Sequence, residues 1–127
     1  MVKTKVLCLG NEFIKEDSLG LKVGDWLSCE LADFDFIKIR DSFGLVNYLQ
    51  GSDRLIVLDV VEGLKNVQEI GINDLKASGI MTAHDFDAGF FLKLIGDDKR
   101  VRIIGLPMNG DLKKIKKRVG EMLKEYI

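Results

Sequence analysis

The chain lacks an excess of charge of either sign. It has 19 Lys and Arg residues against 20 Asp and Glu residues, and its formal net charge is −1 at pH 7. A near-neutral chain has no electrostatic reason to bind nucleic acid or an anionic membrane. It also lacks any apolar run close to the roughly 20 residues that a helix needs to span a bilayer. We therefore expect no nucleic acid and no membrane among its partners.

Several motifs of nucleotide binding, catalysis and targeting are absent as well. The sequence has no G-x-G-x-x-G or Walker loop to cradle a phosphate, and no G-x-S-x-G elbow for a serine nucleophile. Its N-terminal apolar run breaks at Gly10 and is too short for a signal peptide. The two cysteines, Cys8 and Cys29, do not have metal-ligand spacing. We expect both to be free, buried thiols in a reducing cytoplasm.

Apolar residues are plentiful: they fill 46% of the 127 positions, enough for one domain with its own core. Short apolar runs bounded by turn residues predict strands. The predicted strands are Val6–Leu9, Phe34–Ile39, Leu55–Val61, Val101–Leu106 and, more weakly, Val67–Ile72 and Ile80–Ala83. The run Leu55–Val61 is continuous apart from Asp59, which is typical of a strand covered on both faces.

Helical spacing of apolar residues separates these strands. It predicts a helix from Ser18, capped by Asp17 or Ser18, a short helix at 45–49, a helix that begins near Asp85 or Asp87, and a last helix over 112–123. Lysines around the last helix predict a solvated face, with a docking patch for an acidic partner as the alternative. The alternation predicts a three-layer α/β/α fold with a mostly parallel, doubly wound sheet, as a single domain over residues 1–127.

Polar residues follow the predicted strand ends, where ligands bind in open α/β sheets. Glu16 and Asp17 follow the first strand, Asp59 lies near the end of the third, and His84 is the only histidine. If the first and third strands are neighbours, these groups share one crevice. Two carboxylates and one imidazole there suit nickel, zinc or manganese and leave positions open for a substrate.

Each of these residues also has a purely structural interpretation. Asp17 can cap a helix, and a carboxylate near a strand end, such as Asp59, can accept hydrogen bonds from backbone N–H groups. A lone histidine such as His84 is often a hydrogen-bonded core or surface residue. The pattern of the residues alone leaves these alternatives open.

Four motifs occur in the order CLGNEFIKEDSLG, LIVLDVVEG, TAHDFDAGFFLKLI and IIGLPMNG, and they span nearly the whole chain. The first has Gly10, Asn11, Glu16, Asp17 and Gly20 in place. Together they resemble the motifs of the endopeptidases that mature nickel-iron hydrogenases. That family removes a C-terminal extension from the hydrogenase large-subunit precursor after nickel has been inserted. The resemblance implies the same activity here, with the large-subunit precursor as partner.

The resemblance also implies site residues. The family's metal site falls on Asp17, Asp59 and His84, which would serve as metal ligands and as the catalytic residues of an aspartic-type peptidase site. Glu16 and Asp41 are candidate assisting residues. The metal implied is nickel supplied by the precursor, which the protease recognises, and other divalent metals are expected to substitute in vitro.

Three positions depart from the family pattern. Cys8 replaces the first glycine of Gly-x-Gly-Asn, RDSFGL with Asp41 replaces an Asp-Gly-Gly-Thr-like loop, and Lys65-Asn66 replaces Pro-Gly. The departures affect the substrate-contacting loop more than the metal site. Two other functions stay open: a non-cleaving, metal-sensing chaperone for the large subunit, and a small-ligand-binding α/β domain.

Overall fold

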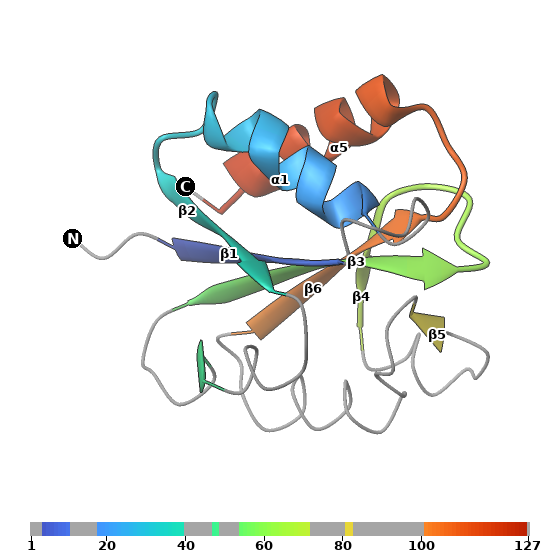
Figure 1. The fold of residues 1–127 in the computed structure, drawn as a ribbon, viewed down its shortest axis with the longest axis horizontal. Coiled ribbons are helices and arrows are strands. Elements are labelled where there is room, and N and C mark those ends of the chain that lie inside the picture. The colour runs from blue at the N-terminus through green and yellow to red at the C-terminus, as the bar shows by residue number, and fades with distance from the viewer. Residues whose placement is uncertain are drawn as a thin grey trace.

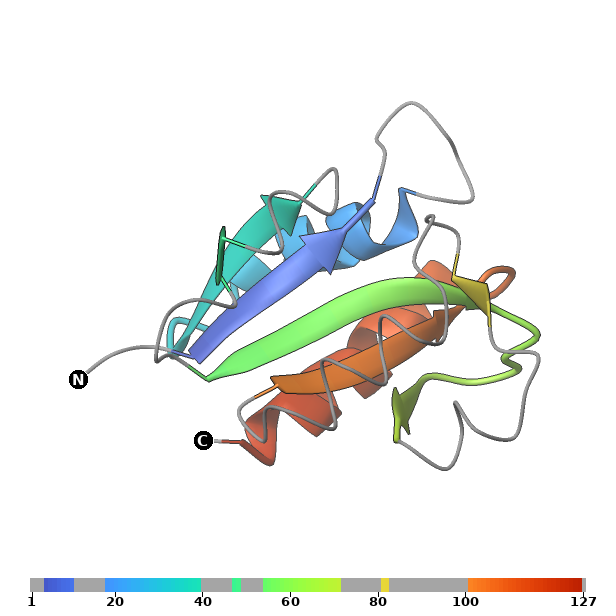
Figure 2. The ribbon, with the colours of Figure 1, turned by 90° about the horizontal axis from the view of Figure 1, so that it is seen from below.

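The computed structural model of the chain describes residues 4–10, 18–39, 47–48, 54–71, 81–82 and 101–126. Five of its strands lie side by side in the order β2-β1-β3-β6-β4, and β5 is attached to β3 (Figures 1 and 2). The strands are β1 Thr4–Leu9, β2 Phe34–Ile39, β3 Leu55–Glu62, β4 Gln68–Ile70, β5 Met81–Thr82 and β6 Val101–Pro107. In this part of the chain, no helix is both long enough and apolar enough to cross a membrane.

The sheet is mostly parallel. β1 pairs in parallel with both β2 and β3, and β3 pairs in parallel with β6, whereas β4 and β5 are antiparallel to their neighbours. The predicted α/β class is thus confirmed, and the structure meets the condition for a shared crevice, since the first and third strands are neighbours. Since β1, β2, β3 and β6 are parallel, their carboxyl ends meet at one edge of the sheet, which we call the carboxyl edge.

Two helices, α1 (Leu19–Ser28) and α5 (Leu112–Lys124), pack side by side on one face of this sheet (Figure 1). Ser18, one of the two predicted caps, occupies the N-cap position of α1, but its side chain makes no capping hydrogen bond there. The N-cap of α5 is Asp111, whose side chain accepts a hydrogen bond from the Lys113 backbone N–H at 2.9 Å. The helix predicted near Asp85 or Asp87 lies outside the described residues.

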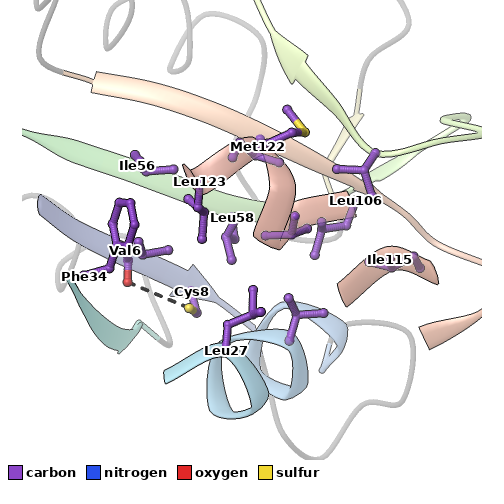
Figure 3. Close-up of a cluster of buried hydrophobic side chains, with 14 of the residues drawn as sticks. Val6, Cys8, Leu27, Phe34, Ile56, Leu58, Leu106, Ile115, Met122 and Leu123 are labelled. Carbon is purple, nitrogen blue, oxygen red and sulfur yellow. Dashed lines mark hydrogen bonds between the residues drawn. The ribbon is translucent and has the colours of Figure 1, made fainter. Parts of the chain in front are cut away.

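Apolar side chains cover both faces of the sheet. One cluster fills the space between the sheet and the two helices, where Leu27 of α1 and Leu123 of α5 approach Leu58 of β3 (Figure 3). A second cluster covers the opposite face and includes Leu7 and Val57. The prediction that the third strand is covered on both faces is therefore confirmed.

The contact between α1 and α5 continues to the surface. The Lys116 ammonium lies 2.7 Å from a Glu30 carboxylate oxygen and 4.1 Å from the centroid of the Trp26 ring. Trp26 is the exposed large apolar residue of the described part of the chain. Lys113 and Lys117, by contrast, point to solvent, as predicted for the outer face of this helix.

The two cysteines have different environments. Cys8 is buried in β1, and burial, followed by the nearby charge of Asp25, raises the pKa of its thiol to about 12. A thiol with that pKa stays protonated near neutral pH and is a poor nucleophile. Cys29 is exposed at the C-cap of α1, so the prediction of a buried thiol is wrong for Cys29. It follows the last residue of the helix, and the apolar spacing in the sequence does not show where the helix ends.

Cys8 is accommodated by a glycine on the opposing helix. A Cβ atom at Gly24 of α1 would overlap the Cys8 Sγ atom and lie 3.3 Å from its Cβ. The Cys8 side chain therefore occupies space that Gly24 leaves empty. The two positions should behave as one packing unit.

We accordingly expect Gly24→Ala to lower the free energy of unfolding by about 1–3 kcal/mol, although alanine favours a helix, because a close-packed core resists added volume. In a Cys8→Ala background the same change should be neutral or stabilising. Thermal and urea unfolding of the four proteins of the cycle measures the coupling, which should reach at least about 1 kcal/mol. Equal effects of Gly24→Ala in both backgrounds would contradict this packing relation.

Candidate functional site at the carboxyl edge

Asp59 is a charged residue within the core. It lies in β3, the central strand, and its exposed fraction is 0%. Side chains alternate along a strand, and Val57 belongs to the cluster on the face opposite the helices, so Asp59 presents its carboxyl group on that same face. An ionised carboxylate is costly to bury in apolar surroundings, and a nearby cation offsets that cost. Within the described part of the chain, Asp59 is thus the best candidate for a residue that binds a cation.

The neighbour of Asp59 on β6 is a glycine. Asp59 pairs with Gly105 in the parallel register. A Cβ atom at Gly105 would lie 2.7 Å from Leu64 Cδ1 and 3.0 Å from Ile70 Cδ1, so these two side chains occupy the space over the glycine. Apolar atoms therefore border Asp59 on the β6 side and separate it from water there.

On its other side, β3 is paired with β1, which ends at the same level. The pairing runs to Cys8 opposite Leu58, and β1 ends at Leu9. The backbone N–H of Gly10 then donates a 3.1 Å hydrogen bond to the Ile39 carbonyl at the end of β2. The carboxyl ends of β1 and β2 thus lie together, β1 on the strand next to that of Asp59 and β2 one strand further out.

Helix α1 begins against this edge. Ser18 is 3% exposed, and a Cβ atom at Gly20 would lie 2.8 Å from the Leu9 carbonyl oxygen and 3.5 Å from the Leu58 carbonyl oxygen. Only a residue without a side chain permits the helix to approach two strand ends this closely. The N-terminus of α1 is therefore packed at the carboxyl edge beside Asp59.

A third segment reaches the same edge through β5. Thr82 lies opposite Val61 in antiparallel register, so the chain leaves β5 in the direction of Asp59. Figure 2 shows β5 beside the end of β3, on the side where β1 has already ended. The carboxyl edge thus receives the ends of several segments that are distant in sequence.

Of the predicted site residues, Asp59 is the one that the structure describes. Glu16, Asp17, Asp41 and His84 lie outside the described residues, and their roles remain predictions. Within the described ranges, no three His, Cys, Asp or Glu residues form a group that could hold a metal ion. The structure does join Gly10 to Ile39 by a hydrogen bond, and it pairs Thr82 with Val61 near the end of β3.

Sequence reasoning did not identify the packing role of Gly20, Gly24 or Gly105. Each of these glycines is explained by an atom on another element: a β1 carbonyl, a β1 thiol and a side chain from the β3–β4 connection. No local pattern marks such a contact. Gly20 stands out in the sequence as part of the first motif, but only the structure shows why a glycine is needed there.

The strand order defines the class of fold: a mostly parallel α/β sheet whose connections reverse direction beside β1 and β3, the position at which open sheets of this class bind ligands. No family model and no curated protein matches the sequence. Among solved structures, the chain resembles the nickel-iron hydrogenase maturation protease HybD from Thermococcus kodakarensis. The two sequences are 26% identical, the match covers 98% of this chain and 99% of that chain, and the TM-score is 0.70.

Two Escherichia coli structures are similar in fold. The solution structure of the endopeptidase HycI has 16% identity over 98% of this chain and 91% of that chain, with a TM-score of 0.63. The hydrogenase maturating endopeptidase HybD has 14% identity over 98% and 94%, with a TM-score of 0.64. At these identities the likeness concerns the fold alone. Together with the motif order, the Thermococcus kodakarensis structure shows that the chain resembles the hydrogenase maturation proteases over nearly its whole length.

Proposed function

We propose that this protein is an endopeptidase that removes the C-terminal extension of a nickel-iron hydrogenase large-subunit precursor and recognises the nickel already bound in that precursor. The observation that carries the proposal is Asp59: a fully buried carboxylate in the central strand, at the edge where ligands bind in this fold class. A divalent cation presented there by the substrate offsets the cost of burying that charge.

Chain connectivity supports Asp17 and His84 as the other ligands. Asp17 directly precedes the buried N-cap Ser18, at the helix end packed on the carboxyl edge. His84 comes two residues after Thr82, and two residues span at most about 7 Å. Val61, the partner of Thr82, is itself two residues from Asp59 along β3. The number of residues along the chain therefore permits Asp17 and His84 to act as ligands together with Asp59, as the proposal requires.

In this proposal the nickel is part of the substrate. Two carboxylates and one imidazole bind it and hold the scissile peptide bond beside the site, which raises the effective concentration of the reacting groups. Water adds to the peptide carbonyl, the C–N bond breaks, and a carboxylate and an amine leave as products. The thiol of Cys8 takes no part, because it is buried and its pKa is raised to about 12.

The experiment that tests the proposal compares nickel-loaded with nickel-free precursor. Purified protein should shorten the loaded precursor and leave the nickel-free form intact, as followed by gel mobility and by the mass of the released extension. Binding of loaded precursor without cleavage would instead support the chaperone alternative. Efficient cleavage of the nickel-free form would overturn nickel recognition.

The acid pair gives a second test. We expect Asp17→Asn to slow cleavage by at least about 100-fold, because loss of even an indirect partner of a metal ligand costs about 10–100-fold. Glu16→Gln should have a smaller effect, since the family motif places the ligand at the second acid. Stability should change little in either variant, because Ser18 and not Asp17 holds the N-cap position. Equal, mild effects on the cleavage rate would remove Asp17 from the ligand set.

A further inference from the structure

A groove opens at the carboxyl edge on the face that carries the helices. Its volume is about 370 Å³, and it lies between the β3–β4 connection, the end of β6 and the first turns of α5. Its apolar lining consists of Val67, Pro107 and Ile115. Pro107 pairs with Val61, two residues beyond the pair that contains Asp59, so the groove lies at the same end of the sheet as the candidate site, although the Asp59 carboxyl group is on the opposite face.

The rim of this groove is basic. Lys65 from the β3–β4 connection and Lys114 and Arg118 from α5 line it, and all three are exposed. Among the described residues of the lining the one carboxylate is that of Asp111, which caps α5 by accepting a hydrogen bond from the Lys113 backbone N–H. Three cations thus face one carboxylate around an apolar floor, in a chain whose formal net charge is −1.

Neither an ion pair nor packing within the described residues accounts for this concentration of charge. Arg118 lies 3.7 Å from a Glu121 carboxylate oxygen, and both side chains are about half exposed, so this ion pair contributes little to stability. The other basic part of α5 differs: Lys116 already contacts Glu30 and Trp26. The groove therefore offers cations that a ligand can engage.

We propose that this groove binds an acidic, partly apolar peptide segment of the precursor in extended conformation. Its apolar side chains would lie on Val67, Pro107 and Ile115, and its carboxylates would meet Lys65, Lys114 and Arg118. The N-terminal end of α5 adds a favourable potential for negative charge. The identity of the chain that supplies the peptide rests on the proposed function, but binding of acidic peptide by the groove does not require cleavage.

The gap at the groove's mouth is maintained by a glycine. A Cβ atom at Gly110 would lie 3.0 Å from Ile115 Cδ1 and 3.6 Å from Pro107 Cγ, so a side chain there would stand over the apolar floor. This position therefore controls how much of the floor a peptide can reach.

The test is a titration of ¹⁵N-labelled protein with a short acetylated peptide of alternating glutamate and leucine, followed by nuclear magnetic resonance. A counterpart with glutamine in place of each glutamate is the control ligand. Peptide binding should shift the amide signals of Asn66, Gly110 and Ile115, weaken at higher ionic strength, and be at least about tenfold weaker for the glutamine peptide. Equal affinity for both peptides, no binding, or shifts centred on Trp26 would overturn the inference.

Charge reversal provides a matched comparison on one helix. The double variant Lys114→Glu, Arg118→Glu should weaken peptide binding at least about tenfold. The control double variant Lys113→Glu, Lys117→Glu changes the charge by the same amount outside the groove, and it should preserve binding. With nickel-loaded precursor, the groove variant should raise KM and keep kcat. Peptide binding without any cleavage would refute the proposed function and leave the groove assignment standing. If the groove variant changes neither cleavage nor peptide binding, the groove assignment is refuted and the proposed function stands.

Discussion

Asp59→Asn should abolish cleavage of nickel-loaded precursor, with a loss well above about 100-fold, while the protein stays folded. Asparagine has nearly the same shape but lacks the negative charge, and a neutral amide binds a divalent cation poorly. The carboxylate is fully buried in β3, and burying a charge is costly. Removing the charge should therefore lower the free energy of unfolding only slightly or even raise it. Cleavage rates and thermal unfolding, measured together, separate these effects.

Asp35→Asn is a suitable control, since Asp35 is exposed in β2 and far from the carboxyl edge in register. It should leave both cleavage and stability unchanged. If Asp59→Asn cuts precursor within about tenfold of the unmodified protein, or if it unfolds, Asp59 is a structural residue and the metal site must be sought elsewhere.

Gly20→Ala should lower both stability and activity. The added Cβ would lie 2.8 Å from the Leu9 carbonyl oxygen, which is backbone and cannot rotate away. Helix α1 must therefore shift from the strand ends, and we expect a loss of about 2 kcal/mol, or roughly 5–10 °C in Tm, despite the better helix propensity of alanine. The shift also moves the N-terminus of α1 at the candidate site, so the cleavage rate of the folded protein should fall as well.

Gly120→Ala is the matched control for this change. Gly120 is also a buried helical glycine, but a Cβ there would lie 3.5 Å from Leu27 Cδ2, an ordinary contact distance. Alanine at that position should be neutral or should stabilise by up to about 1 kcal/mol. A Gly20→Ala protein as stable and as active as Gly120→Ala would show that the close approach of α1 has no functional weight.

Several elements could be predicted from sequence because their signals are local. The run Phe34–Ile39 became β2 with the same bounds, and Leu55–Val61 became β3 with one further residue. Asp59 was conspicuous as the one charge in a buried strand. The weaker prediction over 67–72 became β4, only Gln68–Ile70, because its length and antiparallel direction depend on pairing with β6.

The sequence by itself determined the type and order of the described strands and helices. It also determined the motif order and the candidate residues Asp17, Asp59 and His84. Both follow from hydrophobic periodicity and short motifs, which are properties of neighbouring residues. Only the tertiary structure decided that β1 lies beside β3, that α1 reaches the strand ends through Gly20, and that Lys65 shares a groove with Arg118. Those relations depend on long-range packing, in which segments distant in the chain bury one core together, and no local pattern specifies them.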